Sequence, residues 1–329
     1  MKNFSEKYDA YKKKIDDRIN SLVVLNEPKS LYDPVNYILS GGGKRIRPAM
    51  LLFACEAVGG NIENAIDAGA AIEVLHNFTL VHDDIMDNAD TRRGNETVHK
   101  KWNTNTAILA GDNLIAIAYK SLLKTKSNRL DQIIKEFTEG VIEVCEGQSY
   151  DKDFELMDNV TIDNYLMMIQ KKTAKLIEVS AVIGAIIGGG TNEQIESMRN
   201  FSINAGLAFQ IQDDMLDIIA DEKEFGKKIG GDLIEGKKTY LLLKALETVK
   251  DINEKAVLGN IVKNSGIKEN QEEEIKRIQK IYYDNGVIDS AKKAVENYTE
   301  KAENFLNKFS QEHKDLLTGF SRMLLERNF

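Results

Sequence analysis

Residues 80–94 read LVHDDIMDNADTRRG, in which a cluster of acidic residues is followed at once by basic residues. It places Asp83, Asp84 and Asp87 shortly before a pair of arginines. On a helix, Asp83 and Asp87 would share one face, because they are four residues apart. Like charges at that spacing destabilise a helix unless a cation is bound, and Mg²⁺ takes one or two carboxylates together with substrate phosphates. The stretch therefore predicts a helix that holds a hard divalent cation.

The chain around this stretch has the periodicity of helices. Apolar residues recur every three or four positions over 65–79, 162–179 and 198–215. Three glycines at 188–190 are suited to end one of these helices. The letters TNEQ at 191–194 have the form of a capping box and predict the start of the next helix.

The distribution of proline also favours helix. All three prolines lie in the first 48 residues, and a proline inside a helix costs about 3 kcal/mol. Alternating strand patterns are scarce. The segments around 161–188 and 193–220 look apolar on more than one side, which indicates helices that other helices surround. We expect one all-α domain over residues 1–329, either a helical barrel around a deep central cavity or an ordinary buried bundle.

The amino-acid composition argues against several classes of protein. The chain has 329 residues, 42% of them hydrophobic, with a net charge of −8 and a pI near 5.3, which argues against nucleic-acid binding. Two cysteines without a CxxC pattern predict neither a disulfide framework nor a zinc site. The charged N-terminus differs from a signal peptide, and the most apolar run, 179–187, is too short to cross a bilayer. We expect a cytoplasmic protein without stable membrane insertion.

The aspartate pattern occurs a second time, as Asp213, Asp214 and Asp217. Each copy follows an apolar helical run and has apolar residues inside it. Solvated acidic helix ends are the alternative interpretation of a single copy. Two copies in this context favour a metal role.

Basic residues next to glycines complement these acids. The loop GGGKRIRP at 41–48, the lysine pair at 171–172 and the segment 224–238 are all rich in Lys or Arg. Guanidinium forks suit phosphate oxygens, and glycines let backbone N–H groups approach them. Each pair alone would more often be solvated surface. Together with the acids they predict a diphosphate held by metal ions and cations.

These motifs resemble those of the polyprenyl synthetase family, the trans-isoprenyl diphosphate synthases. GGGKRIRP, LHNFTLVHDDIMDNADTRRG, KKTAKL, FQIQDDMLDI and GKKIGGDLIEGKKT stand in the family's order over nearly the whole chain. The resemblance implies the isoprenoid synthase fold, a homodimer and condensation of isopentenyl diphosphate with an allylic diphosphate. It implies Mg²⁺ as the metal, with three ions, and Mn²⁺ as an alternative.

The resemblance also implies a role for each matching residue. The metal ligands would be Asp83, Asp87 and Asp213, with Asp84, Asp214 and Asp217 as helpers. The allylic diphosphate would be held by Arg92, Lys172, Lys227 and Lys237, with Lys228 as the alternative to Lys227. Isopentenyl diphosphate would be held by Lys44, Arg47, His76 and Arg93. Thr173 and Gln210 would line the site of the reacting carbon.

Product length depends on the residues before the first aspartate. One helical turn spans about 5.4 Å, so Phe78 and Thr79 would meet the growing tail first, with Leu75 deeper. A single aromatic residue and no insertion in the motif resemble archaeal geranylgeranyl diphosphate synthases. The resemblance favours a twenty-carbon product, with fifteen or twenty-five carbons as alternatives. Ordinary core packing is the other interpretation of Phe78.

Other functions share parts of the pattern. A class I terpene cyclase also has an Asp-rich first motif, but it would carry an Asn/Ser/Glu type of second motif and would need no second diphosphate site. A non-catalytic partner subunit would typically lose one aspartate motif, and a plain helical scaffold needs neither. The preferred allylic starter is not predicted by these residues.

Overall fold

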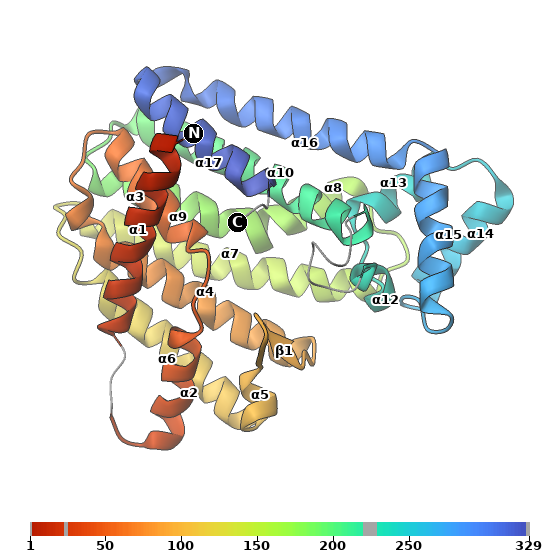
Figure 1. Cartoon of the computed structure of the whole chain (residues 1–329), viewed down its shortest axis with the longest axis horizontal. Helices are drawn as coiled ribbons and strands as arrows, with labels where there is room; N and C mark the ends of the chain where they lie inside the picture. The colour runs from red at the N-terminus through yellow and green to blue at the C-terminus, as the bar shows by residue number, and fades with distance from the viewer. Residues whose placement is uncertain (1, 23–25, 220–228, 327–329) are drawn as a thin grey trace. The chain divides into compact units, whose positions relative to one another are not determined.

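The computed structural model describes residues 2–22, 26–219 and 229–326, and these residues are mostly helical (Figure 1). The α-helices of the first part are α1 (Lys2–Asn20), α2 (Lys29–Ser40), α3 (Ile46–Ala57), α4 (Ile66–Met86), α5 (Val98–Lys101), α6 (Thr104–Leu122), α7 (Leu130–Leu156), α8 (Ile162–Ile169), α9 (Lys175–Ile187) and α10 (Asn192–Ile219). Those of the second part are α12 (Gly231–Glu235), α13 (Tyr240–Thr248), α14 (Ile252–Lys263), α15 (Gln271–Asp284), α16 (Val287–Asn304) and α17 (Gln311–Glu326). The predicted all-α class is confirmed.

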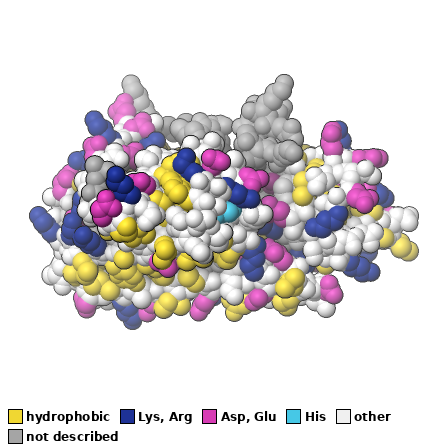
Figure 2. Space-filling model, turned by 90° about the horizontal axis from the view of Figure 1, so that it is seen from below, with side chains coloured by type: hydrophobic (Ala, Val, Ile, Leu, Met, Phe, Trp, Pro, Cys, Tyr) yellow, Lys and Arg dark blue, Asp and Glu magenta, His cyan; other side chains and the backbone are white. Residues whose placement is uncertain are grey.

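Short elements complete the described chain. They are the 3₁₀ turns η1 (Ile62–Asn64) and η3 (Phe305–Lys308), the π-helical turn η2 (Gln170–Ala174), and the antiparallel pair β1 (Thr91–Arg92) and β2 (Asn95–Glu96). Within the described ranges, no helix has the length and apolar character needed to cross a membrane. Acidic and basic side chains are interspersed over the face shown in Figure 2.

The chain groups into two compact units. Unit 1 comprises Met1–Thr138, Val179–Arg199 and Lys308–Phe320, and unit 2 comprises Glu139–Glu178, Asn200–Asn307 and Ser321–Phe329. Both units draw on separate stretches of sequence. The single domain over residues 1–329 stays a prediction.

Unit 1 is organised around α4, which lies alongside α6 and also contacts α1 and α3 (Figure 1). All residues of α4 from Ala68 to Leu75 are buried, and three of them are alanines that allow close helix contact. Phe53 of α3 packs against Phe4, Tyr11 and Phe320, with ring centroids 5.0–6.2 Å apart. This packing fixes α4 along its length and leaves its C-terminal end nearer the surface.

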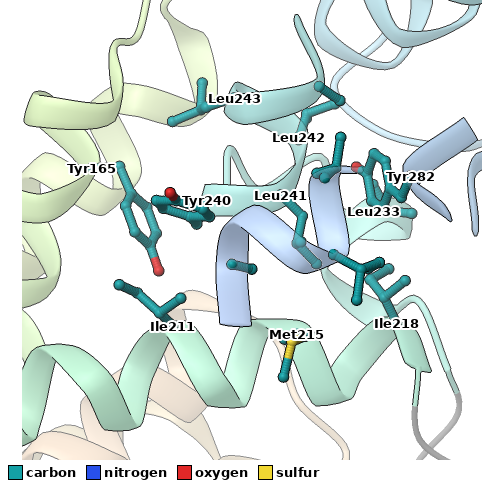
Figure 3. Packing of buried hydrophobic residues seen from close by; sticks show 14 of the residues in the cluster. Tyr165, Ile211, Met215, Ile218, Leu233, Tyr240, Leu241, Leu242, Leu243 and Tyr282 are labelled. Carbon is teal, nitrogen blue, oxygen red and sulfur yellow. The ribbon is translucent and has the colours of Figure 1, made fainter. Parts of the chain in front are cut away.

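Unit 2 has a hydrophobic core built from α8, α10, α12, α13 and α15 (Figure 3). Helix α10 contributes Ile211, Met215 and Ile218, which are at most 4% exposed. These residues repeat at helical spacing, so the side chains of Asp213 and Asp217 lie on a less buried face of the same helix. The core therefore orients the second aspartate motif.

The sequence signals at the start of α10 are confirmed. The backbone N–H of Thr191 donates to Oε1 of Gln194 at 3.0 Å, and the N–H of Gln194 donates to Oγ1 of Thr191 at 3.2 Å. This is the capping box predicted from TNEQ. The periodic segment 162–179 differs from a regular helix, because η2 inserts a π-helical turn between α8 and α9.

Candidate active site

The first aspartate motif lies at the C-terminal end of α4. Asp84 is buried, Asp83 is half-buried and Asp87 is exposed at the C-cap. The last turn of α4 has no basic residue, although the C-terminus of a helix carries partial negative charge. Carboxylates at this end are unfavourable by about 0.3–1 kcal/mol each without a cation. The arrangement is suited to bind one.

The hairpin that follows α4 returns Arg92 to the motif. Its Nε and NH2 atoms both donate to Oδ1 of Asp84, at 2.8 and 2.5 Å. Burial raises the pKa of Asp84, and the hydrogen bonds from Arg92 oppose that rise. A pocket of about 190 Å³ is lined by Asp84, Arg92 and Arg93 together with residues of α2 and α4. Asp84 therefore orients Arg92 at the edge of this pocket.

The glycine-rich loop before α3 is anchored by Arg45. Its guanidinium donates to Glu73 and Asp16, each at 2.7 Å, and to the carbonyl of Gly42 at 3.0 Å. Arg45 and Glu73 are both at most 4% exposed. This buried pair holds the loop against α4. Of the three basic residues in GGGKRIRP, Arg45 thus has a structural partner, and Lys44 is exposed.

Arg47 and His76 are brought together in unit 1. Their side chains meet at 3.1 Å, between NH1 of Arg47 and Nε2 of His76. Burial lowers the pKa of His76 well below its usual value, and the charges of Arg47 and Arg93 lower it further. The imidazole is therefore neutral at pH 7 and accepts from Arg47. Arg93 reaches the same loop, because its guanidinium donates to the carbonyl of Gly42.

The second aspartate motif has its own network in unit 2. Asp214 is buried and accepts hydrogen bonds from the Tyr165 hydroxyl at 2.5 Å and the Gln210 amide at 2.7 Å. Oε1 of Gln210 accepts in turn from the Thr173 hydroxyl at 3.0 Å. In Figure 3 the Tyr165 hydroxyl points toward α10, which carries Ile211. Thr173, Gln210 and Asp214, all predicted site residues, are thus linked.

Asp217 connects α10 to the start of α12. Its Oδ2 accepts from the backbone N–H of Asp232 at 3.2 Å, and its carbonyl accepts from the N–H of Gly230 at 2.7 Å. Burial raises the pKa of both Asp214 and Asp232, and the charge of Asp232 raises that of Asp214 further. This surplus of buried acid again suits a cation.

Two predicted lysines of unit 2 pair with acids. Nζ of Lys172 lies 2.5 Å from Oδ2 of Asp151, and Nζ of Lys237 lies 2.6 Å from Oε2 of Glu235. Lys172, Thr173 and Lys237 line a pocket of about 220 Å³ together with Asp213 and Asp214. Lys227 and Lys228 lie outside the described residues.

The oxygen donors of both motifs fit a hard divalent cation. Each motif presents two carboxylates one turn apart, Asp83 with Asp87 and Asp213 with Asp217, near the negative end of a helix. Among the residues that the structure describes, no three His, Cys, Asp or Glu side chains gather into one protein-only metal site. Mg²⁺ needs only one or two carboxylates when substrate phosphates and water complete its shell.

The predicted chain-length residues lie one to two turns before Asp83 on α4. Leu75 and Phe78 are buried and Thr79 is half-buried. The Phe78 ring packs edge-on against His82, with centroids 4.7 Å apart.

Three residues of the site were not predicted from the sequence: Tyr165, Asp151 and Asp232. Tyr165 stands at a core position of α8, so its pattern indicates only a buried aromatic residue. Asp151 lies five residues before the end of the long helix α7, among other acids. Asp232 lies in the motif GKKIGGDLIEGKKT, in which only the lysines predict a binding role. Only tertiary contacts distinguish these residues.

Known proteins resemble the chain over most of its length. The model of the polyprenyl synthetase family matches residues 28–282. A geranylgeranyl diphosphate synthase of Methanosarcina mazei is 43% identical over 235 residues, covering 71% of this chain and 72% of its own. That of Sulfolobus acidocaldarius is 40% identical over 314 residues, covering 94% and 93%. The crystal structure of a geranylgeranyl pyrophosphate synthetase from Pyrococcus horikoshii superposes with a TM-score of 0.91 at 36% identity, covering 99% and 98%.

Proposed function

We propose that this chain, which belongs to the polyprenyl synthetase family, condenses isopentenyl diphosphate head-to-tail with allylic diphosphates and makes geranylgeranyl diphosphate. It is a trans-prenyltransferase. The observation that carries the proposal is the pairing of two intact aspartate motifs with two basic clusters, in a chain similar over almost its whole length to geranylgeranyl diphosphate synthases.

Catalysis in the family depends on a divalent metal. We assign Mg²⁺ to this role, with three ions and with Asp83, Asp87 and Asp213 as ligands; Mn²⁺ is the alternative. Bound Mg²⁺ would neutralise charge on the departing pyrophosphate. Asp84 then acts by orienting Arg92, and Asp214 and Asp217 act by fixing α10 against α8 and α12.

The basic residues divide between two diphosphates in this proposal. Arg92, Lys172, Lys227 and Lys237 hold the allylic diphosphate, and Lys44, Arg47, His76 and Arg93 hold isopentenyl diphosphate. Support for the second group comes from the contact between Arg47 and His76 and from the reach of Arg93 to the same loop. Arg93 has a lowered pKa because of burial and neighbouring arginines, so a bound anion would relieve the repulsion between these cations.

The reaction follows from this division. The allylic C–O bond breaks, and the leaving pyrophosphate takes the electron pair. The isopentenyl double bond forms the new C–C bond at the allylic carbon, and a proton leaves the resulting cation to restore a double bond. We propose pyrophosphate as the acceptor of that proton. Preorganised cations around the leaving group supply most of the rate enhancement.

We also propose that the chain acts as a homodimer. Helix α6 and its C-cap residue expose three large apolar side chains, Ile108 at 41%, Leu109 at 59% and Leu123 at 56%. Contiguous exposed apolar side chains mark contact surfaces, and Ile108 and Leu109 are neighbours in the sequence. Sedimentation of the wild type and of Leu109→Glu tests this: a dimer that the variant dissociates is expected, and a monomeric wild type contradicts it.

A cytoplasmic location is the remaining part of the proposal. Its support is that Cys55 and Cys145, the two cysteines of the chain, are not joined in a disulfide. Fractionation of the native host would place the enzyme, and recovery with the membrane fraction after a salt wash would contradict this location.

Incubation with isopentenyl diphosphate and each allylic starter, followed by chromatography of the products, tests the function. A twenty-carbon diphosphate with one pyrophosphate released per condensation is expected. A hydrocarbon made without isopentenyl diphosphate would indicate a terpene cyclase, and no pyrophosphate release would indicate a non-catalytic subunit. A fifteen- or twenty-five-carbon product would correct the chain length alone.

The metal role has a separate test. Asp83→Ala and Asp213→Ala should each lower kcat by several orders of magnitude. If both residues serve one pyrophosphate, the double variant should be little worse than either single variant, because groups that act as a unit are not additive. Additive losses would contradict a shared role, and a mild loss in either single variant would contradict metal binding.

A further inference from the structure

The turn that carries Lys172 and Thr173 has an unusual backbone. Residues 170–174 form a π-helical turn, in which the N–H of Lys175 donates to the carbonyl of Gln170. Single π-helical turns are rare in proteins, and those that occur often lie at functional sites. Here the turn presents Lys172 to Asp151 and Thr173 to Gln210, while Lys171 pairs with Glu146.

Helix α7 contacts this turn at Gly147. A Cβ atom on Gly147 would lie 2.3 Å from the backbone N of Lys172 and 2.7 Å from its Cα. Real Cβ atoms essentially never come closer than 3.0 Å to another heavy atom. Because the opposing atoms are backbone, a side chain here could be accommodated only by moving the π-helical turn or α7.

Helix α10 contacts the same turn at Gly206. A Cβ atom on Gly206 would lie 2.6 Å from the Cβ and 2.8 Å from the Cα of Ala174. Gly206 lies one helical turn before Gln210, which accepts a hydrogen bond from the Thr173 hydroxyl. The approach of α10 at Gly206 therefore sets the distance across which Thr173 and Gln210 meet.

We infer that Gly147 and Gly206 are positioning residues, which hold the π-helical turn at the depth where Lys172 faces the allylic diphosphate and Thr173 faces the reacting carbon. The inference rests on the proposed function, because that function makes the placement of the two side chains matter for catalysis. Misplacement of a reacting group by about 1 Å can lower a rate about a hundredfold. A methyl group at either glycine demands a shift of this order.

Gly147→Ala and Gly206→Ala test the inference, with Gly259→Ala as the control. Gly259 is also a helical glycine of unit 2, and a Cβ atom there meets nothing within 4 Å. Both test variants should lower kcat about tenfold to a hundredfold and raise KM for the allylic diphosphate, with KM for isopentenyl diphosphate unchanged. Gly259→Ala should keep wild-type kinetics. Wild-type kinetics in both test variants would overturn the inference.

Amide hydrogen exchange gives a readout that does not depend on activity. A peptide covering 170–175 should exchange faster in both test variants than in Gly259→Ala, while the rest of unit 2 keeps its protection. A uniform loss of protection across unit 2, with both KM values raised equally, would mean general loosening and would overturn the positioning role. Wild-type enzyme that forms no prenyl diphosphate would refute the proposed function, and the exchange result would still decide the placement of the turn.

Two further variants distinguish a local contact with the turn from a general failure of Gly206→Ala to fold. Ala174→Gly removes the Cβ atom that Gly206→Ala would strike, so the double variant Ala174→Gly/Gly206→Ala should recover part of the lost kcat relative to Gly206→Ala. Ala174→Gly alone serves as the reference. If the double variant is no better than Gly206→Ala, contact with the turn is not the cause of the loss.

Discussion

The hydroxyl of Tyr165 lies 2.5 Å from Oδ2 of Asp214, and both side chains are buried in unit 2. This contact joins α8, which precedes the π-helical turn, to the second aspartate motif on α10. Burial and the nearby Asp214 carboxylate raise the pKa of Tyr165 well above its usual value, so the phenol keeps its proton and remains a donor.

Tyr165→Phe removes that donor without changing the packing of the ring. Hydrogen bonds to charged groups contribute about 1.5–3 kcal/mol to stability, so we expect the unfolding midpoint to fall, and kcat to fall as well because Asp214 loses a partner that orients it. Steady-state kinetics and thermal unfolding measure both effects. Tyr282→Phe is the control, because the buried Tyr282 hydroxyl has no hydrogen-bond partner within the described residues. Equal losses in both variants would contradict a specific role for Tyr165.

Arg92→Lys tests the contact between the hairpin and the first motif. Arg92 uses two guanidinium atoms on one oxygen of Asp84, and a lysine cannot reproduce that fork. We expect KM for the allylic diphosphate to rise about tenfold, with KM for isopentenyl diphosphate unchanged. Arg129→Lys, at a site that contacts the carbonyl of Gly190, should leave both KM values at wild type. A rise in KM for isopentenyl diphosphate alone would reassign Arg92 to the other substrate.

His76 gives the stability of the fold a pH dependence. Its pKa is lowered by burial and by Arg47, so the unfolded chain binds a proton more readily than the folded one. Stability is therefore fully present above the unfolded pKa of about 6.5 and is lost as pH falls below it, by at most about 1.4 kcal/mol per pH unit. Denaturant unfolding between pH 7.5 and 5.0 should show a shallower decline in His76→Asn than in the wild type. Parallel curves would show that His76 does not titrate differently on folding.

Phe78→Ala tests the proposed limit on product length. If the Phe78 ring blocks the growing tail, its removal should shift the products beyond twenty carbons. Labelled isopentenyl diphosphate and chromatography give the distribution, and Phe78→Ser should shift it in the same direction. Phe137→Ala creates a comparable cavity at another buried phenylalanine of unit 1 and should leave the distribution unchanged. No upward shift in either Phe78 variant would show that the ring does not set the length.

The helical framework could be predicted from short-range patterns. Apolar spacing identified α4 and α10, and TNEQ identified the start of α10, because periodicity and capping are properties of neighbouring residues. The position of Asp84 and Asp214 within their motifs was equally visible. Their partners were not all visible, because Tyr165 comes 49 positions before Asp214 and reaches it only through the packing of α8 on α10.

The π-helical turn was also beyond prediction from the sequence. Ile169 and Leu176 are seven residues apart, which is two turns of a regular helix, so the apolar pattern passes through 170–174 without a break. The turn is defined by close approach of α7 and α10 at glycines whose local pattern is that of ordinary helix residues.

The hydrogen bond from Thr173 to Gln210 has a consequence for the polarity of the reaction site. Since the hydroxyl proton of Thr173 is directed at Oε1 of Gln210, the oxygen has only lone pairs left for anything that enters the pocket. Lone pairs repel an oxyanion and attract an electron-poor carbon. In the proposed site, the Thr173 oxygen would therefore distinguish the positive end of an ionising substrate from its negative end before any bond is broken.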